Sequence, residues 1–132
     1  SICNTNNTVM IGAPSNVAVK YYGSLVAASD ARLKSDVRPF GEDLGMLLVQ
    51  KLQPVQYTMQ GEARTGFIAQ QVKLAAPHLV HGTEGDIEQG EILGIAQLEI
   101  LPVLVKALQQ SQAQAQRQEQ RIAMQEQRIF QQ

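Results

Sequence analysis

A serine and a lysine five positions apart are the residues of this chain best suited to chemistry. Ser29 and Lys34 stand in the run Ala-Ser-Asp-Ala-Arg-Leu-Lys. A serine hydroxyl is a poor nucleophile unless a base takes its proton, and a lysine serves as that base when burial lowers its pKa. A Ser–Lys pair is the minimal variant of the hydrolase triad. Spacing alone leaves a second interpretation, in which Ser29 caps a helix and Lys34 is a surface lysine.

Two charged neighbours lie between these residues. We expect Asp30 either to cap the following turn or to orient Lys34, and Arg32 to pair with an acid such as Glu42. Ordinary surface ion pairing is the alternative for both side chains.

Metal and cofactor chemistry find little support. His78 and His81 are three residues apart, but Pro77 and Gly82 bracket them and no third ligand is evident. The acids of the polar segment 82–91 lack the ligand spacing of a calcium loop. We therefore expect no metal site and no cofactor.

The composition limits the architecture that must position these residues. The chain has 132 residues, 44% of them hydrophobic, 5% aromatic and none Trp, which provides one modest aliphatic core. A net charge of -1 argues against a generic nucleic-acid binder, and no run approaches the roughly 18 apolar residues of a membrane span. A single cysteine, Cys3, excludes an intrachain disulfide. Because the first residue is not Met, we expect a C-terminal piece cut from a longer protein.

The first segment, residues 1–28, has the pattern of strands and turns. Short β-branched runs at Val9–Ile11, Val17–Val19 and Ser24–Val26 alternate with Gly, Pro and Asn. Three such runs are too small for a core of their own. We interpret the segment as the end of an upstream β-rich passenger.

The second segment, residues 29–94, predicts a small mixed α/β core. A helix is expected from Gly41 or Glu42 through Leu52, with one apolar face made by Leu44, Leu47, Leu48 and Leu52. Two strands that pair with each other are expected at Val55–Met59 and Arg64–Ile68. A short helix, Ala69–Ala76, should stop at Pro77, and a polar loop or hairpin should follow at 82–91.

The third segment, residues 95–132, predicts one long helix. Apolar side chains recur along it every seven residues, at Leu101, Leu108, Ala115, Ile122 and Ile129. A period of seven favours a left-handed coiled coil. The second stripe of the heptad is mostly polar and consists of Leu104, Ser111, Gln118 and Gln125. Layers of Gln amides suit a symmetric trimer, and a solitary helix would leave the apolar stripe without a partner. The fold class expected overall is α+β, assembled as an intertwined homotrimer.

Several runs of the chain together resemble a known family. The run Gly-Ser-Leu-Val-Ala-Ala-Ser-Asp-Ala-Arg-Leu-Lys, residues 23–34, resembles the signature of the intramolecular chaperone auto-processing domain at the C-termini of phage endosialidase tailspikes, tail fibres and neck appendages. The runs Leu-Gln-Pro-Val-Gln-Tyr, Gly-Phe-Ile-Ala-Gln-Gln-Val, Ala-Pro-His-Leu-Val and Leu-Pro-Val-Leu-Val-Lys-Ala-Leu-Gln resemble later parts of that domain, at 52–57, 66–72, 76–80 and 101–109. The similarity covers residues 23–110 in order.

The resemblance implies a self-cleaving chaperone. Such a domain trimerises, helps its upstream passenger to fold and then releases itself, with the serine as nucleophile and the lysine as base. Carried over, these roles fall on Ser29 and Lys34. The scissile bond is then Ala28–Ser29, with Ser29–Asp30 as the alternative. The passenger would belong to a bacteriophage virion tail, and assembly would take place in the host cytoplasm.

Two further positions follow from the resemblance. Gln70 matches a family position and is either an oxyanion donor or part of the scaffold. Gln71 departs from the family pattern, which usually has an acid there, and we expect slower cleavage or a changed pH dependence as a result.

Three other functions are consistent with the sequence. They are a non-cleaving trimerisation module, a receptor-binding fibre tip, and the processing domain of a membrane-tethered transcription factor. In the main hypothesis the only partners are further copies of the chain and its own passenger, with no nucleic acid and no membrane.

Overall fold

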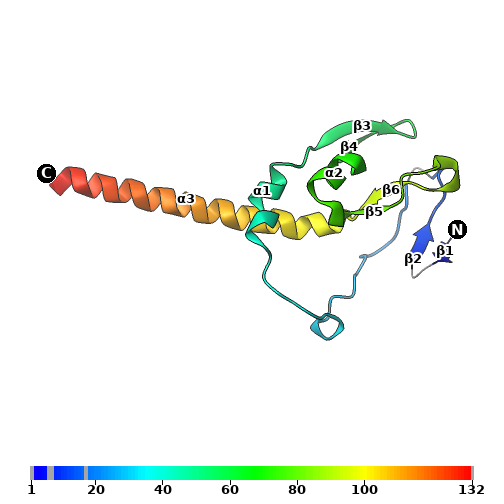
Figure 1. Ribbon diagram of the computed structural model, residues 1–132, viewed down its shortest axis with the longest axis horizontal. Helices are drawn as coiled ribbons and strands as arrows, with labels where there is room; N and C mark the ends of the chain where they lie inside the picture. The colour runs from blue at the N-terminus through cyan, green and yellow to red at the C-terminus, as the bar shows by residue number, and fades with distance from the viewer. Residues whose placement is uncertain (1, 6–7, 17, 132) are drawn as a thin grey trace. The chain divides into compact units, whose positions relative to one another are not determined.

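A computed structural model of the chain describes residues 2–5, 8–16 and 18–131. The fold is α+β, with short β-hairpins and a long C-terminal helix (Figure 1). The chain forms two compact units. Unit 1 comprises Ser1–Arg38 and Gln56–Thr65, and unit 2 comprises Pro39–Val55 and Gly66–Gln132. The boundaries predicted after residues 28 and 94 divide the chain by the expected role of each segment, not by compact units, and they remain predictions.

The first hairpin of unit 1 confirms one of the three runs predicted as strands in the leader. Strand β1 (Ile2–Thr5) pairs antiparallel with β2 (Thr8–Ile11), so that Ile2 lies opposite Ile11. The run Ser24–Val26 is not a strand, and neither are Ala18 and Val19, while Val17 lies outside the described residues. A strand forms only by pairing, and the sheets described in this chain offer these runs no neighbour.

The second hairpin joins β3 (Val55–Met59) to β4 (Glu62–Gly66) through two residues. Gln60 and Gly61 both have positive φ, 54° and 77°, which is what a type I′ turn requires at its two central positions. The first strand was predicted with these bounds. The second begins and ends two residues earlier than expected.

Unit 2 contains the core. Its elements in chain order are η2 (Glu42–Leu44), α1 (Met46–Val49), α2 (Ala69–Ala75), η3 (Pro77–Leu79), β5 (Val80–Gly82), η4 (Ile87–Gln89), β6 (Leu93–Ile95), η5 (Gln97–Glu99) and α3 (Ile100–Gln131). Its buried side chains are all aliphatic and come from α1, α2, η3, α3 and the residue between α2 and η3. They are Leu48, Val72, Ala76, Leu79, Ile100 and Val103. The short helix ends just before Pro77, as predicted. Segment 82–91 joins β5 and β6 as an antiparallel hairpin, with Val80 opposite Ile95.

The helix predicted from residue 41 or 42 through Leu52 is wrong in its continuity. Gly45 interrupts it with a backbone that is not helical (φ −106°, ψ −110°), so a 3-10 turn and one α-helical turn replace a single helix. A Cβ on Gly45 would lie 2.8 Å from Lys106 Cγ and would also clash with the Gln110 side chain. The break therefore lets α3 approach the backbone closely. The predicted apolar face is also incomplete, because Leu47 is 56% exposed.

Helix α3 is the longest element, with 32 residues. Pro102 lies in its first turn, where the amide that proline lacks has no helical acceptor in any case. Helix α1 packs against its N-terminal half, and the C-terminal half extends away from the other elements of unit 2 (Figure 1). None of the helices in the described part of the chain combines the length and the apolar character needed to cross a bilayer.

Candidate active site

The structure brings Ser29 and Lys34 into direct contact. Lys34 Nζ donates a hydrogen bond to Ser29 Oγ over 2.7 Å. Between them lies η1 (Ala31–Leu33), a single 3-10 turn closed by bonds from Leu33 N to Asp30 O (3.0 Å) and from Lys34 N to Ala31 O (3.1 Å). The turn reverses the chain, so the long side chain of Lys34 reaches back to the serine.

Asp30 and Arg32 stabilise this turn. Asp30 Oδ1 accepts from Arg32 N (2.9 Å) and from Arg32 Nε (3.1 Å), and Asp30 Oδ2 accepts from Arg32 Nη2 (2.9 Å). Asp30 thus caps η1 and binds the guanidinium side-on. Chiefly through the side-chain bonds, and then through the backbone N–H, Arg32 holds the pKa of Asp30 below its usual value, while Asp30 raises the pKa of Arg32. The acid paired with Arg32 is therefore Asp30, whereas the sequence had offered Glu42 as its example.

The pair has the geometry for general-base catalysis but lacks enclosure. The lysine amine donates a hydrogen bond to the hydroxyl, whereas activation of the nucleophile requires a neutral amine that accepts the hydroxyl proton. Lysine amines become neutral near physiological pH where water is excluded. In the single chain both Ser29 and Lys34 are exposed.

Gln70 and Gln71 lie at the start of α2 in unit 2. Gln70 Nε2 donates to Glu84 Oε1 over 3.1 Å, which ties α2 to the loop between β5 and β6. Gln71 is exposed and lines a surface hollow with Lys51 and Leu74. The contacts described for Gln70 are those of a scaffold residue.

The two histidines lie in consecutive elements, His78 in η3 and His81 in β5. His78 is exposed within η3, and His81 Nε2 lies 3.9 Å from Glu99 Oε2. Among the residues that the structure describes, no group of three or more His, Cys, Asp and Glu side chains is arranged to hold a metal ion.

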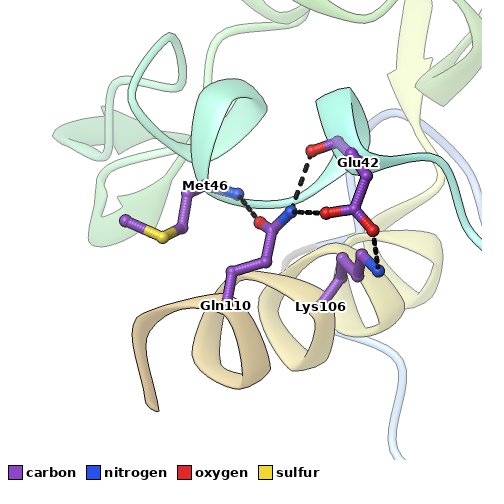
Figure 2. Close-up of polar contacts among 4 residues, drawn as sticks. All are labelled: Glu42, Met46, Lys106 and Gln110. Carbon is purple, nitrogen blue, oxygen red and sulfur yellow. Dashed lines mark hydrogen bonds and ion pairs between the residues drawn. The ribbon is translucent and has the colours of Figure 1, made fainter. Parts of the chain in front are cut away.

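Sequence reasoning missed a polar cluster that fastens η2 and α1 to α3. Figure 2 shows this clasp, which consists of Glu42, Met46, Lys106 and Gln110. Gln110 Oε1 accepts from Met46 N (2.8 Å), and Gln110 Nε2 donates to Glu42 O (2.9 Å) and to Glu42 Oε2 (3.0 Å). Lys106 Nζ forms an ion pair with Glu42 Oε1 at 3.0 Å. The Gln110 side chain thus provides an acceptor for the N–H of Met46, at the start of α1, and a donor for the carbonyl of Glu42, in η2.

Electrostatics favour the charged form of the carboxylate in the clasp. The hydrogen bond from Gln110, followed by the hydrogen bond and positive charge of Lys106, holds the pKa of Glu42 below its usual value. The Lys106 side chain is only 21% exposed, whereas that of Glu42 is 84% exposed. The partners are at least 64 residues apart in the chain, so no local pattern could have predicted the cluster.

Helix α3 uses two different faces. Ile100 and Val103 are buried in the core, and Lys106 and Gln110 continue that face into the clasp. The heptad stripe lies on another face and is open, with exposures of 54% to 71% at Leu101, Leu108, Ile122 and Ile129. The helix is therefore packed against its own unit on one side and leaves an apolar stripe uncovered on another.

Part of the chain matches a known protein family. Residues 29–81 match the model of Peptidase S74, described as chaperone of endosialidase. The match begins at Ser29, includes Lys34, and ends at His81 at the first strand of the β5–β6 hairpin. No curated protein matches the chain. Residues 29–81 are therefore similar to the chaperone of endosialidase, and this match supports the intramolecular chaperone domain suspected from the sequence.

Proposed function

We propose that this chain is a self-releasing chaperone. Three copies associate through α3, hold their upstream passenger segments together while those fold, and are then released by autoproteolysis at Ser29. The family of residues 29–81 supports the chaperone role. The phage tail fibre or tailspike as passenger, and the host cytoplasm as the site of assembly, are part of the same proposal.

The observation that carries the cleavage proposal is the 2.7 Å contact between Lys34 Nζ and Ser29 Oγ. It is held by a capped turn rather than by a chance meeting of two surface side chains. Exposed polar pairs add little stability. A contribution to the stability of the fold therefore does not explain this contact between the lysine and the serine.

The reaction proposed is an acyl shift followed by hydrolysis. Neutral Lys34 takes the hydroxyl proton as Ser29 Oγ attacks the carbonyl carbon of Ala28 through a five-membered ring. The bond from that carbon to Ser29 N then breaks, and the nitrogen leaves as an amine that has gained a proton from Lys34. Water hydrolyses the resulting ester, which frees the carboxylate of Ala28 and restores the serine hydroxyl. Cleavage of Ser29–Asp30 is the alternative.

Assembly is proposed to supply the enclosure that the single chain lacks. Ser29 and Lys34 are exposed in one copy, and a lysine acts as a base only where water is excluded. Neighbouring copies in the trimer would cover the pair, so cleavage would follow association. This order suits a chaperone, because early release would separate passengers before they had folded.

The benefit to the passenger is one of concentration and register. Pairing of strands between three chains is slow and leaves open edges that aggregate. Tethering the three C-termini raises the effective concentration of the strands and fixes their starting alignment. Removal of the tether afterwards makes assembly one-way.

Variants of the pair test this function. The full chain with Ser29→Ala should stay uncleaved yet trimeric, and Lys34→Ala should be cleaved far more slowly. The matched controls are Ser35→Ala and Lys20→Ala, which should be processed like the parent chain. Normal processing of Ser29→Ala, measured by denaturing mass spectrometry, would refute the assignment of the nucleophile.

The same experiment separates the rival functions. An unchanged mass together with a stable trimer would indicate a trimerisation module or a fibre tip that remains on the fibre. A transcription-factor processing domain would require a DNA-binding region upstream and a membrane segment downstream in the full-length protein. The first residue of the released fragment, Ser29 or Asp30, decides which bond is cut.

A further inference from the structure

The charged side chains of the C-terminal half of α3 are not arranged for a solitary helix. They are all exposed, and they are Arg117, Glu119, Arg121, Glu126 and Arg128. None takes part in an ion pair within the described residues. No opposite charge lies three or four positions from any of them, although such pairs stabilise isolated helices. Arg117 and Arg121 are even like charges four residues apart, which is unfavourable.

The charges are ordered relative to the heptad stripe. With Leu108, Ala115 and Ile122 at position a of the heptad, Glu119 and Glu126 both fall at position e. Arg121 and Arg128 both fall at position g, and Arg117 at c. Positions e and g flank the apolar stripe of a coiled coil and meet the neighbouring helix there. Carboxylates thus occupy one flank of the stripe and guanidinium groups the other.

This separation distinguishes the two ways in which copies can associate. In a parallel, in-register coiled coil a g residue faces the e residue five positions further along the neighbouring helix. Arg121 of one copy then faces Glu126 of the next, and Gln114 faces Glu119. In an antiparallel arrangement g faces g and e faces e, which would bring arginines against arginines and glutamates against glutamates.

We infer that the flanks of α3 select a parallel, in-register assembly of copies of this chain, with Arg121 and Glu126 as the residues that determine alignment. The inference rests on the self-association in the proposed function and adds its direction and register. Each helix-to-helix contact of a trimer contains one such pair. Parallel alignment also places all passenger segments at the same end, as templating requires.

Charge reversal tests the pair. In the full chain, Arg121→Glu and Glu126→Arg should each weaken association, by about tenfold or more in dissociation constant, since attraction becomes repulsion at every contact. The double variant restores opposite charges and should recover most of the loss. Arg117→Glu makes the same charge change away from the flank and is the matched control. Analytical ultracentrifugation over a dilution series measures each constant.

Disulfide trapping tests the alignment. Gln125→Cys, in a Cys3→Ser background, places a thiol at a d position near the end of the stripe. Parallel copies bring these thiols together, so oxidised glutathione should crosslink the chains, whereas antiparallel copies would hold them about 30 Å apart at 1.5 Å per residue. Gln109→Cys, off the stripe, is the control that should remain uncrosslinked.

The two proposals fail in different ways. A chain that stays monomeric at every concentration would overturn the self-association itself. A stable oligomer that is indifferent to reversal of Arg121 and Glu126, or that gives no Gln125→Cys crosslink, would overturn only the alignment inference.

Discussion

At the scale of single residues, the 3-10 turn η1 accounts for the contact in the candidate site. The sequence predicted that Ser29 and Lys34 act as a pair, and their two side chains are in contact. The acid partner of Arg32 was less predictable from sequence. Asp30 precedes it by two residues, and the 3-10 turn brings both side chains to the same side, while Glu42 is engaged by Lys106 and Gln110.

Removal of the cap should slow cleavage without abolishing it. Asp30→Ala deletes the acceptor for Arg32 N and the partner of its guanidinium, so η1 would frequently open and Lys34 would leave Ser29. The rate at which the shorter fragment appears, followed by mass spectrometry, should fall several-fold while the trimer remains. Asp36→Ala removes a nearby carboxylate outside the turn. If it slowed cleavage as much, the positioning role of Asp30 would be wrong.

At the scale of elements, local patterns predicted the parts that local forces determine. The strand Val55–Met59 and the helix ending before Pro77 follow from β-branched alternation and from proline's missing N–H. The break at Gly45 and the clasp depend on α3, more than 60 residues away, and so had no local signal. The run Ser24–Val26 has the composition of a strand but does not form one, because it pairs with no strand among the described residues.

The close approach at Gly45 predicts a large effect from one methyl group. Gly45→Ala would force apart α1 and the side chains of Lys106 and Gln110, and the free energy of unfolding should fall by about 1–3 kcal/mol. Gly94→Ala is the matched control, because its Cβ would meet nothing within 4 Å. Denaturant unfolding followed by circular dichroism measures both. Equal stability of the two variants would contradict the close packing described.

The clasp predicts a pH dependence with a definite sign. Because folding lowers the pKa of Glu42, its carboxylate stabilises the fold fully above its ordinary value of 4.5, and this contribution is lost as pH falls through the lowered value. Glu42→Gln lacks the titrating group. The difference in unfolding midpoint between the parent chain and this variant should be constant near neutrality and shrink under acid conditions. A difference that grew on acidification would contradict the assignment.

At the scale of the whole molecule, α3 packs into a folded unit with one face and carries an exposed apolar stripe on another. Its core-facing side is satisfied within the chain, whereas Leu101, Leu108, Ile122 and Ile129 remain exposed. The heptad period alone predicted this stripe, because a repeat of seven needs no long-range information.

The open stripe predicts which apolar residues hold the copies together. Ile122→Asn should weaken association strongly, since Ile122 lies on the stripe. Met124→Asn should have little effect, because Met124 is off the stripe although its exposure is nearly the same, 56% against 55%. Sedimentation of both variants at matched concentration makes the comparison. Equal loss of association would mean that another face mediates assembly.

The intact mass of the freshly expressed chain under denaturing conditions tests the central claim most directly. We expect the 14.5 kDa chain to give way to a shorter fragment beginning at Ser29, and the native mass of this fragment to correspond to three copies. A wild-type chain that assembles as a trimer yet keeps its full mass would contradict autoproteolysis by Ser29 and Lys34.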